Sequence, residues 1–531
     1  MENTRRTGSL PTLYLAGAIV ALSAPAAKAQ LVDLQQSPNT VNVGIAKSLG
    51  QETGAGVGNV MTPNSSIYII KRDPARAIRR GRQLFQRKFT KWQGLGPRVG
   101  DGTGNIDADV RIGAGISDSC AGCHGRPRGS AGSGGNVATR PDSRDAPHLF
   151  GLGVKEMLGD EITTDLRAIR TQALAQARST NTAVSLTLTS KGINYGTIRA
   201  LPNGTVDTSR VVGVNPDLRV RPFGAQGGTI SIREFLVGAF KAEMGVEAVD
   251  AQLAQASSGG QFTTPAGMVL NGQLDKIEAP PNSFPGQDND GDGVTNELPA
   301  ALVDFEEFYL LNYFKPATYE QTSVTQQGLT TFNQIGCNSC HIQDLTINHD
   351  RRVADFETVY DPQRGIFNQL FATANVEFTQ TNDGSGFPTL KLPAQQSFVA
   401  HNFFADMKRH DLGPNFHERN YDGTTQTLFM TAPLWGVGTT APYGHDGRSV
   451  NLKEVILRHG GEAQAQRDAF AALPDTSKSA LIEFLNSLVL FPPDDTASSL
   501  DRGNPAAVGF PQQGHGSIKL GVLFNDPTDP E

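Results

Sequence analysis

Apolar side chains recur at helical spacing in several stretches of the chain, separated by segments rich in glycine and polar residues. Asp73 followed by Pro74 is typical of a helix start, because an aspartate caps free N–H groups and a proline fits the first turn. The apolar spacing predicts helices from residue 73 onward and over residues 154–179, 230–244, 300–314, 322–334 and 479–490. We therefore expect a mainly α protein.

Other stretches lack helical spacing. Val184, Leu186 and Leu188 alternate with polar residues, and Asn203-Gly204 is a hairpin turn signal, so a small β insertion is expected near residues 181–225. Residues 94–146 are rich in glycine and long for a loop without an internal scaffold. The 58 glycines and 31 prolines of the chain also predict long loops, and a bound group is expected to organise this one.

The first 29 residues are typical of a secretory signal. Arg5 and Arg6 precede an apolar stretch from Leu10 to Leu22, and small residues around Ala29 offer a cleavage site. The alternative is an N-terminal anchor helix that stays attached. No later segment approaches the roughly 20 apolar residues of a membrane-spanning helix. We expect an exported protein, periplasmic or extracellular, with no membrane span in the mature chain.

Charge and cysteine content narrow the classes of partner. Without residues 1–29 the chain keeps 43 basic and 52 acidic side chains, a net charge of −9. This balance argues against nucleic acid or an anionic membrane as partner, and permits a basic electron-transfer protein. Four cysteines are too few for disulfides to stabilise so large an exported protein.

Two copies of one motif contain all four cysteines: Cys120-Ala-Gly-Cys123-His124 and Cys337-Asn-Ser-Cys340-His341. The pattern C-x-x-C-H is the attachment signature of c-type haem. The thiols bond to the porphyrin, and the histidine is placed to be the proximal iron ligand. A zinc site would need four ligands around the metal, and a thioredoxin-like pair would need a βαβ setting that is missing here. The sequence predicts two covalent haem c groups.

The sixth ligand of each iron decides the role of that haem. An iron with two firm protein ligands transfers electrons, whereas an iron with a vacant position binds peroxide or oxygen. Eight further histidines are available: His148, His349, His401, His410, His417, His445, His459 and His515. His445 and His459 both lie in the densest motif region, residues 431–462.

Further motifs surround the two haem signatures between residues 75 and 490. They are Gly94–Pro97, Ala146–Gly153, Glu243-Met-Gly245, Asp406–Gly413 and the block Ala432–Glu462. With the C-x-x-C-H motifs, this set resembles the di-haem cytochrome c peroxidase superfamily, and more closely its di-haem oxidoreductase branch. The resemblance implies two cytochrome-c-like helical domains with one haem each. It also implies that electrons enter at the C-terminal haem and that the N-terminal haem is reactive.

The resulting domain prediction has six parts. They are a signal peptide (1–29), an extended lead-in (30–72), an N-terminal haem domain (73–180), a middle region with the β insertion (181–319), a C-terminal haem domain (320–495) and an irregular tail (496–531).

The resemblance also implies a sixth ligand for the C-terminal haem. In the peroxidases this ligand, usually methionine, lies fourteen residues after the histidine of a Pro-Tyr-x-His-Asp-Gly turn. Here His445 is the turn histidine and His459 lies fourteen residues later, so His459 is the predicted ligand. A second imidazole would lower the reduction potential. The alternative is that His459 only ends a helix, where a cation suits the helix dipole. His445 is expected to support the turn.

The N-terminal haem departs from the peroxidase pattern. No histidine or methionine lies between His124 and His148, so either its sixth position is open, which we favour, or His148 fills it. No acid-base glutamate is assigned, and the catalytic residues stay unknown. Trp92 and Trp435 are candidate electron bridges, although a role as buried core aromatics is the more common one for such residues.

A separate stretch alternates carboxylates as oxygen-ligated calcium loops do. Its candidate ligands are Asp288, Asp290, Asp292 and Glu297. Pro299 occupies the twelfth position, where such loops have a glutamate, so Glu297 would have to complete the shell. The alternative is an Asx-rich turn without metal.

Together these features predict an exported di-haem peroxidase or oxidase that receives electrons from a small redox protein or other donor. Its substrate would be peroxide, oxygen or a small organic molecule. The alternatives are a non-catalytic di-haem electron carrier and a di-haem oxygenase of an organic substrate.

Overall fold

The computed structural model describes residues 49–96, 117–124, 145–313, 317–318, 321–353, 355–358, 374–377, 396–420 and 423–489. The predicted signal peptide, the tail and most of the glycine-rich loop lie outside these ranges. Helix is the main secondary structure, so the mainly α prediction is confirmed. Within the described ranges, no helix combines the length and apolarity needed to cross a membrane.

The α-helices of the described residues are α1 (Leu49–Thr53), α2 (Ser66–Arg72), α3 (Pro74–Gln86), α4 (Cys120–His124), α5 (Leu152–Thr180), α6 (Ile232–Ala239), α7 (Ala251–Ser257), α8 (Ala300–Asn312), α9 (Ser323–Gln334), α10 (Leu452–Arg458), α11 (Gln464–Ala472) and α12 (Asp475–Asn486). Shorter helical turns are η2 (Lys91–Gln93), the π-helix η3 (Phe240–Met244), η4 (Cys337–Ser339), η5 (Val437–Thr439) and η6 (Gly461–Ala463).

The strands are β1 (Val184–Ser190), β2 (Ile193–Ala200), β3 (Val206–Val211), β4 (Ala248–Val249), β5 (Gln261–Thr263), β6 (Val269–Asn271), β7 (Leu298–Pro299), β8 (Ala317–Thr318), β9 (Leu345–Ile347), β10 (Asp355–Thr358), β11 (Ala374–Glu377), β12 (Phe398–Ala400), β13 (Arg409–Asp411), β14 (Glu418–Arg419), β15 (Thr425–Gln426), β16 (Leu428–Met430) and β17 (Leu488–Val489). Of the described sheets, β1-β2-β3 has three strands and the rest are two-stranded; β4 and β7 pair in parallel.

Local signals explain where the predicted helices begin and end. The Asp73 side chain accepts a hydrogen bond from the backbone N–H of Arg76 (3.1 Å), as predicted for the start of α3. The C-terminal helix α12 begins and ends four residues earlier than predicted. Its first turn carries Asp475, which suits a helix N-terminus, and Leu488 beyond its end pairs with β8 instead of continuing the helix.

Two helix pairs, distant in sequence, cross in the same way. A Cβ atom at Gly81 of α3 would collide with the carbonyl oxygen of Phe305 in α8, and a Cβ at Gly328 of α9 would collide with that of Ala480 in α12. The helices can approach this closely only because both positions lack a side chain. Phe305 and Ala480 lie 175 residues apart in sequence.

The aromatic contacts of the two crossings also match. Phe85 packs on Tyr309 with ring centroids 5.8 Å apart, and Phe332 packs on Phe484 at 5.6 Å. Tyr309 and Phe484 are again 175 residues apart. The segments Gly81–Phe85 and Gly328–Phe332 both begin with glycine and end with phenylalanine, and each precedes a C-x-x-C-H motif in the sequence. Their likeness reflects two helix crossings with matching contacts.

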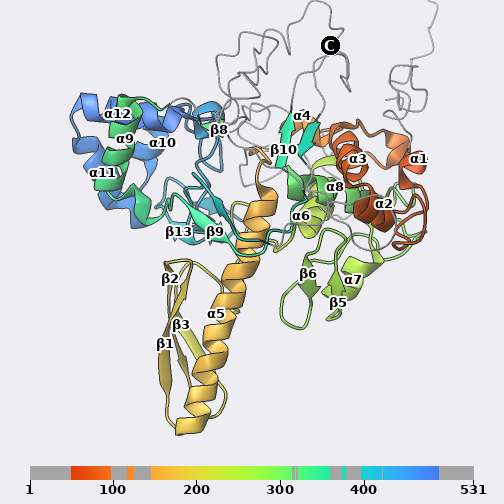
Figure 1. The fold of residues 1–531 in the computed structure, drawn as a ribbon, viewed down its shortest axis with the longest axis horizontal. Helices are drawn as coiled ribbons and strands as arrows, with labels where there is room; N and C mark the ends of the chain where they lie inside the picture. The colour runs from red at the N-terminus through yellow and green to blue at the C-terminus, as the bar shows by residue number, and fades with distance from the viewer. Residues whose placement is uncertain are drawn as a thin grey trace, which may run out of the picture.

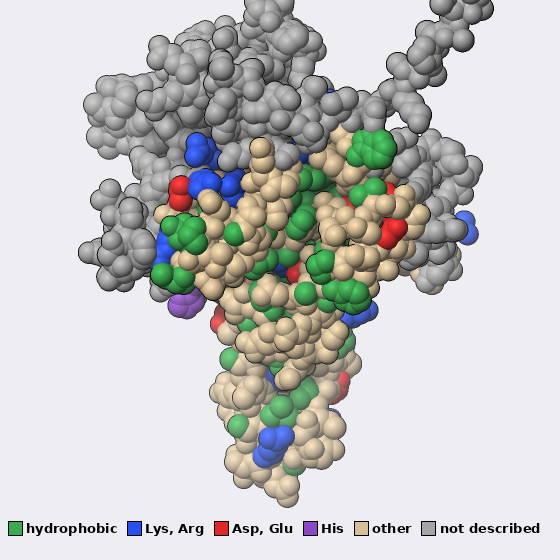
Figure 2. Space-filling view, turned by 90° about the vertical axis from the view of Figure 1, so that its right-hand side faces the viewer, with side chains coloured by type: hydrophobic (Ala, Val, Ile, Leu, Met, Phe, Trp, Pro, Cys, Tyr) green, Lys and Arg blue, Asp and Glu red, His purple; other side chains and the backbone are tan. Residues whose placement is uncertain are grey.

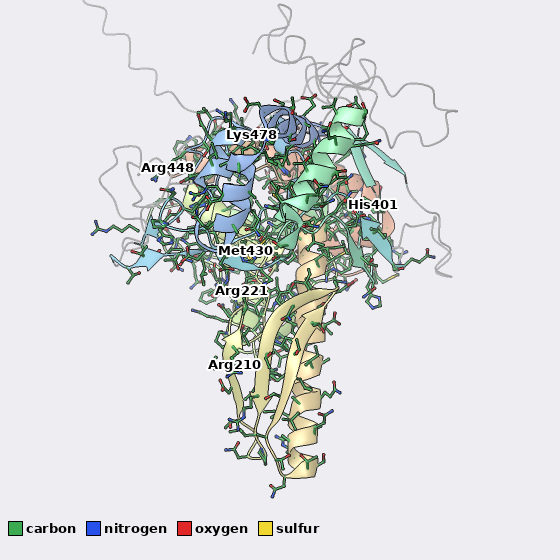
Figure 3. All side chains as sticks on the ribbon, turned by 90° about the vertical axis from the view of Figure 1, so that its left-hand side faces the viewer. Arg210, Arg221, His401, Met430, Arg448 and Lys478 are labelled. Carbon is green, nitrogen blue, oxygen red and sulfur yellow. The ribbon has the colours of Figure 1, made fainter. Side chains whose placement is uncertain are left out.

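The β insertion forms an arm with the long helix α5 (Figure 1). Strands β1, β2 and β3 form an antiparallel sheet that packs on α5. At the base of the arm, Met430 donates its backbone N–H to the Ala225 carbonyl (2.8 Å); Figure 3 shows Met430 and Arg221 there, and Arg210 further along the sheet. The space-filling view in Figure 2 shows the arm projecting from the body.

The two tryptophans differ in burial. Trp435 is 2% exposed and belongs to the apolar core that α5 shares with β9. Trp92 is 73% exposed, so its interpretation as a buried core aromatic is wrong. It lies in the short turn η2, which has too few apolar neighbours in sequence to bury an indole.

Candidate haem sites

The C-terminal motif follows α9 and its histidine is held by the backbone. Residues Cys337–Ser339 form the turn η4, and the backbone N–H of His341 donates to the Cys337 carbonyl (3.1 Å). The His341 ring places Nδ1 2.9 Å from the Phe404 carbonyl oxygen. Because a carbonyl can only accept, Nδ1 carries the proton and Nε2 keeps the lone pair that binds a metal.

His459 is held in the same way and lies near His341. It ends α10, and its Nδ1 donates to the Val455 carbonyl (2.6 Å), which leaves the Nε2 lone pair available. The pKa of His459 is lowered to about 4, mainly by burial; the hydrogen bond to the Val455 carbonyl opposes this effect, and the neighbouring His341 contributes to the lowering. A protonated helix-ending histidine is therefore disfavoured. Both rings are thus neutral, each leaves its Nε2 free, and the two lie near enough to interact electrostatically.

His410 lies beside the C-terminal motif but is bound on both ring nitrogens. Its Nε2 is 2.8 Å from Asp406 Oδ2 and its Nδ1 is 2.8 Å from Glu462 Oε2. Burial alone would lower the pKa of His410, but hydrogen bonds with Asp406, Cys340 and Glu462 raise it to about 11. His410 is therefore a buried cation next to the attachment cysteine, and it has no free lone pair for iron.

This cation should make stability depend on pH. The pKa of His410 in the folded protein lies above its ordinary value of 6.5. The stability that this residue contributes to the fold is therefore complete below pH 6.5 and is lost as the pH rises through about 11. His410→Gln is expected to lower the free energy of unfolding by about 2 kcal/mol at pH 6, since it leaves buried Asp406 short of a partner. Denaturant unfolding should show that the difference in unfolding free energy between wild type and His410→Gln becomes smaller as the pH approaches 11.

A matched control is His417→Gln. His417 also pairs with a carboxylate, Asp411, at 2.7 Å, but both side chains are partly exposed, so little loss is expected. An equal loss for both variants, or a pH-independent loss for His410→Gln, would contradict the assignment of His410 as a stabilising buried cation.

His445 supports the turn rather than facing a second imidazole. Its ring stacks on Phe429 with centroids 4.0 Å apart, and Nε2 lies 2.8 Å from Glu418 Oε1, an ion-pair distance without hydrogen-bond geometry. Its backbone carbonyl accepts the N–H of Asp145 (2.9 Å). The residue thus connects the C-terminal motif block to the segment just before His148.

The histidine of the N-terminal motif is held by a backbone carbonyl, as the histidine of the C-terminal motif is. It forms the short helix α4, and Nδ1 of His124 donates to the Pro147 carbonyl (2.6 Å). The Cys120 thiol donates to Glu306 of α8 (3.4 Å). Burial raises the pKa of Glu306 to about 8, so this carboxyl is protonated at neutral pH before any haem is attached.

His148 links the two motif regions. Its Nε2 donates to the backbone carbonyl of Trp435 (3.1 Å), and its buried Nδ1 has no hydrogen-bond partner. Burial lowers the pKa of His148 to about 4, so the ring is neutral. His148 directly follows Pro147, whose carbonyl accepts the hydrogen bond from His124. It therefore joins the segment that holds the N-terminal motif to the C-terminal motif block.

The contacts that join His148 to Trp435 continue to His341, the histidine of the C-terminal motif. The Trp435 ring packs edge-on against Phe403 (4.8 Å), and the Phe403 carbonyl accepts the N–H of Leu434 (3.2 Å). The next residue, Phe404, is the acceptor of His341. A continuous path of peptide and hydrogen bonds thus joins the carbonyl that holds His124 to the carbonyl that holds His341.

Sequence reasoning did not assign a role to Glu243, although it lies in a quoted motif. Glu243 is half-buried on the π-helix η3, a type of turn that is frequent at functional sites. Burial raises the pKa of the Cys123 thiol, a hydrogen bond with Ser117 lowers it, and the Glu243 carboxylate raises it further. Glu243 therefore lies close to the haem attachment point.

The four predicted calcium ligands fall into two groups that share Asp290. Asp288, Asp290 and Asp292 form one group, and Asp290, Glu297 and Glu247 form the other; in each, the ligand oxygens lie within 4.8 Å of one another. Sequence reasoning missed Glu247, because it lies 41 positions before Asp288 and carries no motif of its own.

A model of a known protein family matches part of the C-terminal region of the chain. Residues 343–488 match the family model described as "Di-haem oxidoreductase, putative peroxidase"; the match includes His410 and His459 but begins after both C-x-x-C-H motifs. The comparison with curated proteins gave no match.

A solved structure that matches the chain is the crystal structure of a MauG-like protein associated with microbial copper homeostasis. It is 14% identical, the alignment covers 54% of this chain and 77% of that one, and the TM-score is 0.24, a likeness on which no argument is based. The family match therefore concerns residues 343–488, and the family that it names is one of haem-containing redox proteins.

Proposed function

We propose that this chain is an exported redox enzyme with two covalent c-type haems, a peroxidase or oxidase. Electrons enter at the C-terminal haem from a small redox protein or other donor, and peroxide or oxygen is reduced at the N-terminal haem. The observation that carries the proposal is the asymmetry of two otherwise matching sites. Both motif histidines are anchored to carbonyls, and each has a second neutral histidine near it. His459, near His341, leaves its Nε2 lone pair free, whereas His148, near His124, donates its Nε2–H to the Trp435 carbonyl.

The C-terminal residues fit an electron-transfer role. Cys337 and Cys340 would attach the haem, and His341 and His459 would ligate its iron. Fixed Nδ1–H donors hold both rings, so little rearrangement is needed when the charge of the iron changes. Bound haem supplies an iron that exchanges one electron and, where a position is vacant, binds peroxide or oxygen.

The N-terminal residues fit a reactive role. Cys120, Cys123 and His124 would hold the haem. His148 is tied by its Nε2 to Trp435 and by its backbone to Pro147, which supports a bridging role and an open sixth position. Peroxide reduction also consumes protons, and the half-buried carboxyl of Glu243 beside Cys123 is the candidate proton donor.

His148→Phe is expected to slow electron equilibration between the two haems several-fold, because it removes the hydrogen bond to the Trp435 carbonyl. Rapid reduction followed by stopped-flow absorbance would measure this rate. Trp435→Phe is the matched control, since it removes the indole but keeps the backbone carbonyl that accepts the bond. Loss of rate only in Trp435→Phe would assign the path to the indole, and an unchanged rate in both would reject this path.

The experiment that tests the proposed function is electron paramagnetic resonance of the oxidised holoprotein, before and after addition of peroxide or cyanide. One low-spin and one high-spin signal are expected, with only the high-spin signal responding. Two unresponsive low-spin signals would favour an electron carrier. Turnover with oxygen and an organic substrate, but not with peroxide, would favour an oxygenase.

A further inference from the structure

A buried cluster of oxygen atoms lies between the parallel strands β4 and β7 and the 288–292 loop. Glu247, Asp290 and Glu297 are 1%, 2% and 3% exposed, and their carboxylate oxygens lie within 4.8 Å of one another. Asn282, 1% exposed, donates its Nδ2–H to Glu247 Oε2 (2.9 Å) and so lies against the same group. Three acidic side chains and one amide thus converge out of contact with water.

Several of these oxygens have no hydrogen-bond donor. Glu247 Oε2 accepts from Asn282 and from the Asn289 backbone, and Glu297 Oε2 accepts from the Glu247 N–H (2.6 Å), so one oxygen of each carboxylate is fixed. The other oxygens, Glu247 Oε1 and Glu297 Oε1, and also Asn282 Oδ1, are buried without a partner. Buried acceptors of this kind are costly unless a ligand satisfies them.

The local charges are also unbalanced. Burial raises the pKa of Glu297 to about 9; a bond from the Glu247 N–H opposes this rise, and Asp290, Asp292 and Glu247 add to it. Burial likewise raises the pKa of Asp290 to about 7, and the Asp292 carboxylate adds to that rise. Carboxylates are therefore crowded together in this buried cluster.

We propose that Glu247, Asn282, Asp290 and Glu297 bind one calcium ion. An all-oxygen set of three carboxylates and one neutral amide suits a hard cation, and a flexible shell that includes an amide oxygen suits Ca²⁺ better than Mg²⁺. Zinc would favour nitrogen or sulfur ligands, which this set lacks. The site is independent of the proposed haem function.

This ligand set differs from the one that the sequence pattern predicts. Asp288 accepts the backbone N–H groups of Gly291 (2.7 Å), Asp292 (3.1 Å) and Gly293 (3.0 Å). Asp292 accepts the Val294 N–H (2.6 Å). These two carboxylates shape the loop, while Asp290 and Glu297 point to the buried group. The ion would thus join the 288–292 loop to Glu247 and Asn282.

The experiment is calcium titration calorimetry of the metal-stripped holoprotein, with Glu247→Gln compared against Asp288→Asn. Both variants replace one carboxylate by its amide. Wild type should bind one calcium per chain, and Glu247→Gln should weaken binding by at least about 10-fold, an effect of the size seen even for outer-shell changes. Asp288→Asn should weaken it less. The haem absorbance and circular dichroism spectra verify that each variant is folded.

A second readout on the wild type guards against a variant that fails to fold. Calcium should raise the thermal unfolding temperature of the wild-type holoprotein, because an ion that binds only the folded state stabilises it. Absence of calcium binding, or binding without a rise in the unfolding temperature, would overturn the proposal. A greater loss of calcium affinity in Asp288→Asn than in Glu247→Gln would mean that the 288–292 loop alone binds the ion. This result would overturn the proposed ligand set.

Discussion

Replacing Glu243 by glutamine is expected to lower peroxide turnover by about 10²- to 10⁴-fold, the contribution typical of a positioned general acid or base. The glutamine keeps the size of the side chain but carries no transferable proton. Because Glu243 is half-buried on η3 and acts electrostatically on Cys123, its carboxyl is near the haem and still accessible to solvent for reprotonation. Steady-state peroxide assays of the fully haem-loaded protein would measure the loss.

Glu306→Gln is the matched comparison. Glu306 also lies beside a cysteine of the motif, but its side chain is fully buried in α8, so its carboxyl is not in contact with solvent for reprotonation. We expect Glu306→Gln to keep most of the activity. A large loss in Glu306→Gln with normal activity in Glu243→Gln would transfer the proton-donor role to α8. The absorbance of both haems in each variant must match the wild type for this comparison to hold.

His459→Met is expected to raise the reduction potential of one haem by on the order of 100 mV, because a thioether stabilises the reduced iron relative to an imidazole. Potentiometric titration followed by absorbance would resolve the two haems, and only one midpoint should move. His459→Ala should instead convert a low-spin signal to high spin.

His445→Gln is the control for this pair of variants. His445 lies fourteen positions earlier in the same motif block, and its ring stacks on Phe429. It should leave the spin state of both haems unchanged. If His459→Met moves neither midpoint, or if His445→Gln alone changes the spin state, the assignment of His459 as an axial ligand is wrong.

Local signals made much of the fold predictable. The start of α3 depends on Asp73 and Pro74, and the hairpin between β2 and β3 on Asn203-Gly204, all of which act through neighbouring backbone groups. The haem motifs were equally visible, because the attachment chemistry requires fixed spacing. The structure adds that His341 and His459, 118 residues apart, lie close to each other.

Long-range packing could not be predicted in the same way. Nothing in the sequence near Gly81 indicates that its partner helix begins more than 200 residues later, at Ala300. The four calcium candidates were chosen by alternation along the chain, whereas burial selects Glu247 and Asn282 from outside the loop. Periodicity and motif spacing report on neighbours in sequence, and these contacts join residues that only the tertiary fold brings together.

The arm built from α5 and the β1–β3 sheet has a practical consequence. At about 1.5 Å per residue, the 29 residues of α5 span roughly 43 Å, and its first turn begins four residues after His148. The turn at residues 180–183 at its far end is exposed. A tag or a gold-binding group inserted there would attach the protein to an electrode at a set distance from the haem motifs, so that voltammetry could report on both centres without blocking either one.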